Sequence, residues 1–417
     1  MTGKGGVGKT TVAAGTAALA ARSGRRTLVM STDAAHSLAD AYGLSGAGSD
    51  PVEVEPGLWV QQVDTQRELE RSWSEVSGYL RAVLDAAGVD HLTAEELTVV
   101  PGLEEVLALL ELRAHVRQQH RSGGGPWDVV VVDCAPTAET LRLLALPEAL
   151  RWYLDRVGGP ERRLLKALRP VVGRATGLPV PGDEVISAVE RLQADLLEVR
   201  RLLVRPESSV RLVLTPERVV LAEARRSLTT LSLLGYRVDG VVANRVFPAG
   251  AGAWADGWQA AQAEVLAEVH DSFAPLPVWT SSYAAAEPVG PDAVASVAQD
   301  AYASRGTEDP FAVPEGPGPV RVRRLGATGP GERRGAELRV SLPFVATGDV
   351  DLARHGESLV VTVGAYRRVL TLPASLARWP VSGATVDDGV LRVRFREAAA
   401  AAAAEDDVPE QGEEQPW

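Results

Sequence analysis

The sequence predicts an α/β region with a mostly parallel sheet and a helical subdomain, followed by an all-β sandwich. Up to about residue 305, short apolar runs alternate with longer helical patterns, as in parallel-sheet proteins. Residues 308–319 are rich in proline and glycine and indicate a linker. Beyond the linker, short β-branched or alternating runs are separated by Gly, Asp and Pro, which is typical of an all-β module.

A glycine-rich turn stands at the start of the chain, directly before a predicted helix over residues 9–22. Residues 3–10 read Gly-Lys-Gly-Gly-Val-Gly-Lys-Thr and fit the pattern G-x-x-x-x-G-K-[ST]. In such a loop, backbone N–H groups point at phosphate oxygens, Lys9 reaches the β- and γ-phosphates and the Thr10 hydroxyl ligates Mg²⁺. The pattern predicts a P-loop NTPase core that binds ATP and Mg²⁺ through Gly3, Gly5, Gly6, Val7, Gly8, Lys9, Thr10 and Thr11.

Only Met1 and Thr2 precede this loop. A P-loop follows a buried strand, and a strand needs about four to six residues. We therefore expect the natural protein to begin several residues upstream. If Met1 were the true start, nucleotide binding should be weakened.

Six apolar runs predict the strands of the α/β region: residues 27–31, 58–63, 128–133, 210–215, 240–244 and 277–280. Two of these runs are continuously apolar, as expected for strands covered on both faces. Long helical patterns predict a helical subdomain on top of the sheet, over about residues 66–125 and 138–206. Its expected helices are residues 67–87, 103–120, 138–154, 161–169 and 183–204. The α/β domain as a whole is expected to span residues 1–307.

Residues 320–397 are expected to form the β-sandwich, with strands at residues 320–324, 336–343, 358–363, 366–372 and 390–396. Residues 398–417 are an alanine run followed by an acidic tail. The alanines favour helix locally, but the tail has too little apolar surface to fold. We expect residues 398–417 to be a disordered, solvated end.

Composition excludes several classes of protein. A net charge of −12 argues against a general nucleic-acid binder, which needs a basic face. The single cysteine, Cys134, excludes internal disulfides and indicates a reducing compartment. The sequence has no secretion signal and no apolar stretch of membrane-spanning length. We expect a cytoplasmic protein that does not insert directly into membranes.

The glycine loop carries a second lysine, Lys4, and residues 4–10 resemble the deviant Walker A motif of the signature-lysine ATPases. That group includes the arsenite-pump ATPase ArsA and the tail-anchored-protein-targeting ATPases. The resemblance covers about residues 1–305 and implies a homodimer in which Lys4 reaches the partner's nucleotide. A solvated loop lysine is the alternative for Lys4.

Two further segments resemble the switches of this group. Residues 31–38, Ser-Thr-Asp-Ala-Ala-His-Ser-Leu, resemble switch I, and Asp33 matches the aspartate that directs the attacking water. Asp33 could also cap a helix that begins at Ala34, and the two roles are compatible. Residues 132–144 resemble switch II, with Asp133 holding Mg²⁺ through water. The sequence departs from the family there, with Cys134 in place of threonine and Glu139 in place of histidine.

Residues 241–245, Val-Val-Ala-Asn-Arg, resemble the family's adenine-reading position, where the Asn244 amide offers a donor and an acceptor. A turn-capping asparagine is the alternative, and residues 277–290 are expected to add a second wall to the base pocket. One cysteine cannot build the family's inter-subunit Cys-x-x-Cys zinc site or the three-cysteine arsenite site of ArsA. We therefore expect no zinc.

The C-terminal module resembles the α-crystallin domain of small heat-shock proteins, and the resemblance is carried by residues 338–343, 356–363, 366–373 and 388–395. A generic β-sandwich is the alternative. Taken together, the resemblances imply a dimeric ATPase switch that binds, targets or chaperones a hydrophobic client protein. The alternatives are an ATPase that energises a membrane anion exporter, with a membrane-protein partner, and a nucleotide-gated scaffold. Only Met1 and Met30 are methionines, so a methionine-lined client groove is not expected.

Overall fold

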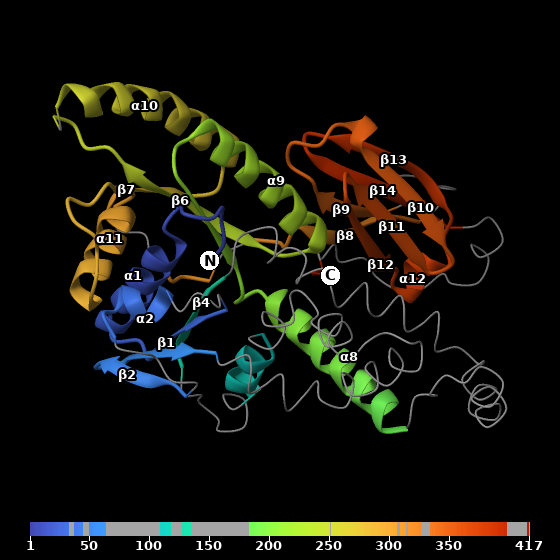
Figure 1. Ribbon diagram of the computed structural model, residues 1–417. Helices are drawn as coiled ribbons and strands as arrows, with labels where there is room; N and C mark the ends of the chain where they lie inside the picture. Colours follow the sequence, from blue (N-terminus) through green and yellow to red (C-terminus); the bar gives the residue numbers. More distant parts are fainter. Residues whose placement is uncertain are drawn as a thin grey trace, which may run out of the picture. The chain divides into compact units, whose positions relative to one another are not determined.

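The computed structural model of the chain (Figure 1) describes residues 1–32, 37–44, 50–63, 109–117, 127–134, 183–250, 252–306, 309–313, 316–326, 334–397 and 415–416. These residues fall into two compact units. The first comprises Met1–Leu202 and Ser281–Phe311, and the second comprises Leu203–Thr280 and Ala312–Trp417. Among the described helices, none is long and apolar enough to cross a membrane.

The first unit contains a four-stranded sheet in the order β2-β3-β1-β4. Strand β1 (Thr27–Ser31) lies between β3 (Leu58–Gln62) and β4 (Val129–Asp133) and runs parallel to both. Every residue of β1 is buried, as the continuous apolar run predicts. Strand β2 (Val52–Glu55), which the sequence pattern does not reveal, is antiparallel to β3 at the edge of the sheet.

Helix α1 (Lys9–Arg22) packs on this sheet through small side chains, mostly alanines. It also packs against α11 (Pro291–Ala303) so closely that a Cβ on Gly15 would lie 2.1 Å from the Val294 carbonyl oxygen. The Thr16 and Tyr302 hydroxyls lie 2.6 Å apart between the two helices. Alanine and glycine thus let α1 approach its neighbours at backbone distance.

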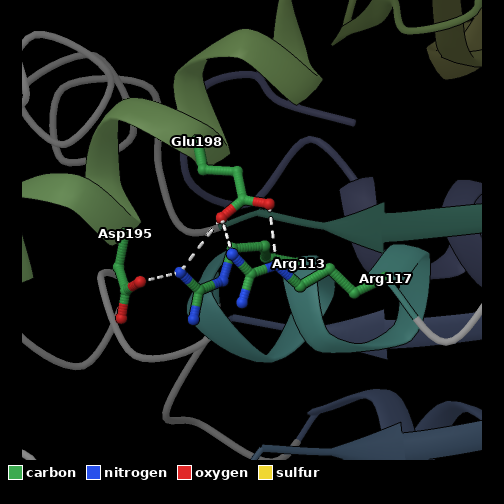
Figure 2. A network of polar contacts seen from close by, with 4 residues as sticks. All are labelled: Arg113, Arg117, Asp195 and Glu198. Carbon is green, nitrogen blue, oxygen red and sulfur yellow. Dashed lines mark hydrogen bonds and ion pairs between the residues drawn. The ribbon is translucent and has the colours of Figure 1, made fainter. Parts of the chain in front are cut away.

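Two described segments belong to the predicted helical subdomain: a helix over residues 109–117 and α8 (Asp183–Leu203). The other predicted helices, residues 67–87, 138–154 and 161–169, lie outside the described residues. Arg113 and Arg117, one helical turn apart, form ion pairs with Asp195 and Glu198 of α8 (Figure 2).

The helix over residues 109–117 is also tied to the sheet. The ring nitrogen Nε2 of His115 lies 2.7 Å from the Gln61 Oε1 atom of β3, and the Gln61 amide donates to Glu111 at 3.2 Å. Trp127, just before β4, packs edge-on against both Trp59 and His115. The helix is therefore anchored to the strands on either side of β1.

The second unit contains a sheet in the order β5-β6-β7, in which β5 (Val210–Leu214) is parallel to β6 (Val238–Val246). Strand β7 (Val278–Ser282) is the third member. Helix α9 (Arg218–Leu234) connects β5 to β6, and α10 (Ala253–Phe273) follows β6. The predicted strands at residues 210–215, 240–244 and 277–280 are thus present, and β6 is longer than expected.

The all-β prediction is confirmed in the same unit (Figure 1). A five-stranded sheet has the order β13-β14-β9-β8-β15, and a three-stranded sheet has the order β10-β11-β12. Their bounds are β8 (Val320–Leu325), β9 (Gly335–Ser341), β10 (Val350–His355), β11 (Ser358–Val363), β12 (Tyr366–Thr371), β13 (Val381–Asp387), β14 (Val390–Arg396) and β15 (Gln415–Pro416). We call residues 320–397 the β-domain. Its buried core includes Leu338, Val361, Leu370, Val393 and Phe395.

The β-domain packs on helix α9. Leu233 of α9 belongs to the β-domain core, and the Thr229 hydroxyl donates a 2.6 Å hydrogen bond to the Pro343 carbonyl. The buried Arg368 guanidinium of β12 donates to the Leu233 carbonyl, near the C-terminal end of α9. A cation there is favoured because helix-end carbonyls lack intrahelical partners.

The predicted linker is held to the first unit at its start. Asp309 forms a 2.6 Å ion pair with Arg25, and the Phe311 ring lies 5.0 Å from the Arg25 guanidinium carbon. Phe311 also packs edge-on against Tyr302 of α11. Residues 309–311 are therefore packed against α/β elements.

Candidate nucleotide site

The glycine loop has the backbone geometry that its composition predicts. Gly6 and Gly8 have φ values of 81° and 89°, in the left-handed region that glycine adopts without strain. Gly8 is the N-cap of α1, and its carbonyl accepts the Val12 amide at 3.0 Å. Val7 is buried and fixes the loop to the core. The loop therefore leads directly into the positive end of α1.

The outer side of the loop is open. Gly5 and Gly6 are exposed, and a Cβ added at either position would meet no atom within 4 Å. Backbone N–H groups in such a turn, next to a helix N-terminus, form an anion-binding concavity. The loop thus fits a chain of phosphates.

Lys9 lies on the inner side of the loop, where 7% of its surface is exposed. Its Nζ atom donates to the Lys4 carbonyl oxygen at 3.3 Å, so the ammonium is folded back over the loop. Lys4 itself is half-buried. Both lysines required by the signature are therefore present in one turn, and the ammonium of Lys9 spans it.

Two hydroxyl side chains meet next to the loop, and a buried carboxylate ends the strand β4. The Thr10 and Ser37 hydroxyl oxygens lie 3.4 Å apart, Ser37 being the first residue of α2 (Ser37–Ala41). Asp133, the last residue of β4, is buried and lies opposite Ser31 of β1 in the register. The Thr32 amide donates to the Asp133 carbonyl at 2.9 Å and joins the two strand ends.

Met1 lies beside β4, at the carboxyl end of that strand. Its amino group donates to the Val132 carbonyl, and its carbonyl accepts the Cys134 amide at 3.1 Å. This is the bonding pattern of a parallel strand neighbour, so the residue before the glycine loop runs along β4. The loop consequently starts beside Asp133.

Two predicted residues lie outside the described residues: Asp33 and Glu139. Asp33 is flanked by described positions, because Ser31 ends β1, Thr32 follows it and Ser37 begins α2. The structure therefore brings together Lys4, Lys9 and Thr10, and it places Thr32 and Ser37 on either side of the predicted water-directing segment. The role of Asp33 itself stays a prediction.

Asn244 lies in the second unit, where it is 4% exposed near the end of β6. The residue that follows it, Arg245, has a φ of 60°, so the chain turns sharply after Asn244. Gln262 of α10 holds this turn with both ends of its amide. It donates to the Arg245 carbonyl at 3.0 Å and accepts the Phe247 amide at 2.8 Å.

Sequence reasoning assigned no role to Ser37 or Gln262. Ser37 could have been found from its place in the switch I resemblance, six residues after the end of the strand. Gln262 gives no such signal, because a glutamine in a helix is usually solvated. Its partners, Phe247 and Arg245, lie 15 and 17 residues upstream and outside its helix. Among the described residues, no group of three or more His, Cys, Asp or Glu side chains could hold a metal ion by itself.

Comparison with known proteins agrees with this geometry. The anion-transporting ATPase family matches residues 1–303, and an HSP20-like domain found in ArsA matches residues 333–395. The chain is 32% identical over 400 residues to a Chlorobaculum tepidum protein named "Putative arsenical pump-driving ATPase", covering 95% of each chain. It is 36% identical over 403 residues to an uncharacterized Streptomyces coelicolor protein, covering 95% of this chain and 96% of that one.

A third relative is the ATPase GET3 of Lachancea thermotolerans, which is 27% identical over 254 residues, or 58% of this chain and 70% of GET3. The family match supports nucleotide binding and ATP hydrolysis, the activities for which the loop geometry is suited. It also identifies the β-domain as HSP20-like, which confirms the α-crystallin resemblance. The chain belongs to the anion-transporting, or ArsA, ATPase family.

Proposed function

We propose that this chain is a homodimeric, Mg²⁺-dependent switch ATPase of the cytoplasm, which couples ATP hydrolysis to the binding of a hydrophobic client protein. The observation that carries this proposal is the open glycine loop, with Lys9 folded across it and Thr10 directly after it, which starts near the end of β4 where Asp133 lies. This arrangement offers backbone donors and one ammonium to phosphates, and oxygen ligands to a hard cation.

In this proposal the backbone from Gly3 to Thr11 cradles the phosphates, and Lys9 swings from the Lys4 carbonyl to the β- and γ-phosphate oxygens. Thr10 holds Mg²⁺ directly and Asp133 holds it through water, with the Ser37 hydroxyl close enough to Thr10 to orient that ligand. When bound, Mg²⁺ neutralises charge on the phosphates. Asn244 reads the adenine edge, and Gln262 keeps the turn after it in place.

Asp33 directs the attacking water. Its carboxylate accepts a hydrogen bond from the water and thereby aims the oxygen at the γ-phosphorus, in line with the leaving β-phosphate oxygen. Lys4 of each subunit contacts the nucleotide of the partner, so that closure of the dimer and occupancy of the two sites are linked. The loss of the γ-phosphate removes this contact and releases the closure.

The route from the nucleotide to a client is supported by contacts within the first unit. Strand β1, which leads into the Asp33 segment, is flanked by β3 and β4. Gln61 of β3 binds His115 and Glu111, and Arg113 and Arg117 of the same helix pair with α8. A displacement at the strand ends therefore acts on helices of the predicted helical subdomain.

The first test is phosphate release by the full-length protein with Mg²⁺ and ATP. We expect Asp33→Asn to bind ATP normally and to lose most turnover, about 10²-fold or more, because the attacking water is no longer directed. Lys9→Ala should lose both binding and turnover. Equal turnover by the wild type and Asp33→Asn would refute the assignment of the site.

The second test concerns the dimer. Sedimentation of Asp33→Asn with and without ATP should show a dimer that tightens with ATP, and Lys4→Ala should remove the ATP effect while leaving ATP binding intact. Purification of Asp33→Asn with ATP from cells should then retain the client. If ATP tightens the dimer equally in proteins with Lys4 and with Lys4→Ala, Lys4 is a solvated loop lysine.

A second function is favoured by the names of several relatives, which describe arsenical pump-driving ATPases. In that function the chain would energise a membrane anion exporter. The single cysteine removes the three-cysteine arsenite site as an activator. Stimulation of phosphate release by arsenite or antimonite would favour the exporter, and its absence together with client capture would favour the switch.

A further inference from the structure

The outer face of the five-stranded sheet of the β-domain carries arginines on three neighbouring strands. The register places Arg321, Arg339 and Arg392 opposite one another on β8, β9 and β14. The next row contains Arg323, Glu337 and Arg394, and Arg396 ends β14. We call the six arginines of these rows the arginine face. The alternate residues of the same strands point into the β-domain core.

Among the described residues, two carboxylates pair with arginines of this face. Glu337, whose side chain is 5% exposed, accepts the Arg339 Nε at 2.6 Å and the Arg394 Nε at 3.1 Å. Burial raises the pKa of Glu337, but these two hydrogen bonds outweigh burial and lower the pKa, so the carboxylate stays ionised. Arg392 pairs with Asp387 at 3.2 Å. Glu337 and Asp387 therefore pair with three arginines of this face, Arg339, Arg394 and Arg392.

Such a face is unexpected in a chain of net charge −12. Like charges directly opposite one another on neighbouring strands destabilise a sheet. Three arginines in one cross-strand row therefore indicate a surface shaped for an anionic ligand, and the exposed Arg323, Arg394 and Arg396 leave it accessible. Arginine suits such a role because its planar group binds carboxylates in a bidentate way.

The chain contains a matching anion in its own tail. After Arg396 there is no lysine or arginine, and residues 405–414 contain six carboxylates: Glu405, Asp406, Asp407, Glu410, Glu413 and Glu414. The end of the tail returns to the same sheet. Strand β15 pairs antiparallel with β8, Gln415 opposite Val322 and Pro416 opposite Arg321. The tail thus rejoins the β-domain at the edge strand that carries Arg321 and Arg323.

We propose that the arginine face is a docking surface for an acidic peptide segment and that its resident occupant is residues 405–414 of the same chain. The segment leaves the sheet at the end of β14 and returns at β15, three strand spacings away, or about 14 Å. The eighteen residues 397–414 between these strands can span up to about 60 Å, so their length allows the acidic residues to cross the face.

The consequence is competition. A segment tethered at both ends has an effective concentration on the order of millimolar, so it covers the face without high intrinsic affinity. An acidic segment of another protein reaches the arginines only when it displaces the tail. The tail therefore sets a threshold for partners of the β-domain.

The scarcity of lysine makes a direct test possible, because the chain has lysine only at positions 4, 9 and 166. The substitution Arg323→Lys places an amine on the arginine face, and a carbodiimide joins that amine to any carboxylate in contact with it. Arg367→Lys is the matched control, since Arg367 is an exposed strand residue of the other sheet. The full-length proteins are treated with the carbodiimide in dilute solution, and the cross-links are mapped by mass spectrometry.

For Arg323→Lys we expect cross-links within one chain to residues 405–414 at about 0.01 M salt, where the Debye length is about 30 Å. At about 1 M salt, where the Debye length is about 3 Å, these cross-links should fall about tenfold. Arg367→Lys should give none to the tail. Equal tail cross-links in both variants, or none in either, would overturn the proposal.

A second measurement separates the tail from other anions. Replacing all six tail carboxylates by their amides should free the face, so that a synthetic peptide of residues 404–417 binds this variant and not the wild type. If the variant binds a single-stranded oligonucleotide and does not bind the peptide, the face serves nucleic acid and the proposal is wrong. Peptide binding that survives Arg321→Gln with Arg323→Gln would also contradict it.

Discussion

Helices α1 and α9 each follow a loop that leaves the carboxyl side of a sheet. They differ in packing, because α1 buries small side chains and α9 buries large ones. Helix α1 is lined by alanines and Gly15 and packs at backbone distance within the first unit. Helix α9 buries leucines, and one of them, Leu233, belongs to the core of the β-domain. Helix α9 lies inside the part of the chain that matches the ATPase family, yet it packs in the same compact unit as the β-domain. The sequence boundary between the two matched families is therefore not the boundary between the two compact units.

The largest expected effect comes from α1. In Gly15→Val the new Cβ would lie 2.1 Å from the Val294 carbonyl oxygen and 2.9 Å from the Ala298 Cβ, and α1 and α11 would have to separate. We expect a loss of about 3 kcal/mol or more in the free energy of unfolding. Gly257→Ala on α10 is the control, since nothing lies within 4 Å of that position. Urea unfolding of both variants measures the difference, and a mild effect at Gly15 would show that the two helices are not in close contact.

The second effect concerns the end of α9. Arg368→Met removes the donor to the Leu233 carbonyl and leaves that carbonyl buried without its hydrogen bond, at a cost of about 1–3 kcal/mol. The neighbouring Arg367 is exposed, so Arg367→Met should change stability by less than about 0.5 kcal/mol. Hydrogen exchange of the amides in α9 and β12 should increase together in Arg368→Met. An increase confined to β12 would mean that the helix does not depend on the β-domain.

A smaller effect is expected at the hydrogen bond between α9 and the β-domain. Thr229→Val should cost about 0.5–1.5 kcal/mol, because it removes the bond to the Pro343 carbonyl. Thr230→Val is a close control, because the Thr230 hydroxyl donates to the Arg226 carbonyl of its own helix. Equal losses in both variants would assign the effect to helix propensity and not to the junction.

The two units should also differ in their response to acid. Burial lowers the pKa of His115 in the first unit despite the nearby Glu111. Folding therefore disfavours its protonation, and stability in that unit should fall as pH drops below the ordinary histidine value of about 6.5. His115→Gln should flatten this dependence between about pH 7 and 5.

Glu337 affects stability at a lower pH than His115 does. Its pKa is lowered in the folded β-domain, so its contribution to stability is present above the ordinary value of about 4.5 and is lost as pH falls through the folded pKa. Thermal unfolding followed separately in each unit by hydrogen exchange should show the first unit weakening at the higher pH. If both units weaken in the same window, neither group dominates the response.

Much of this arrangement could be predicted from local patterns. Continuous apolar runs identified β1 and β4, and the glycine spacing identified the loop before α1, in which Gly6 and Gly8 have positive φ. Strands β2, β10 and β13 escaped because their burial is partial and their side chains do not alternate clearly. The linker prediction missed that Asp309 and Phe311 bind Arg25, since a proline-rich composition says nothing about partners far upstream.

Long-range partners were beyond sequence reasoning for the same reason. Nothing in the residues around Leu233 or Arg368 indicates that they meet, because they are separated by 135 positions. The bridging amide of Gln262 is equally invisible, although it holds the turn after Asn244. Local spacing reveals the glycine loop, whereas side chains that join distant segments emerge only from the folded chain.

The place of Leu233 in the β-domain core has an evolutionary consequence. A gene that lost the region encoding the β-domain would expose the Leu233 side chain and would remove the donor to the Leu233 carbonyl near the end of α9. Loss of this domain is therefore expected to favour substitutions on α9 that suit a solvent-exposed helix end.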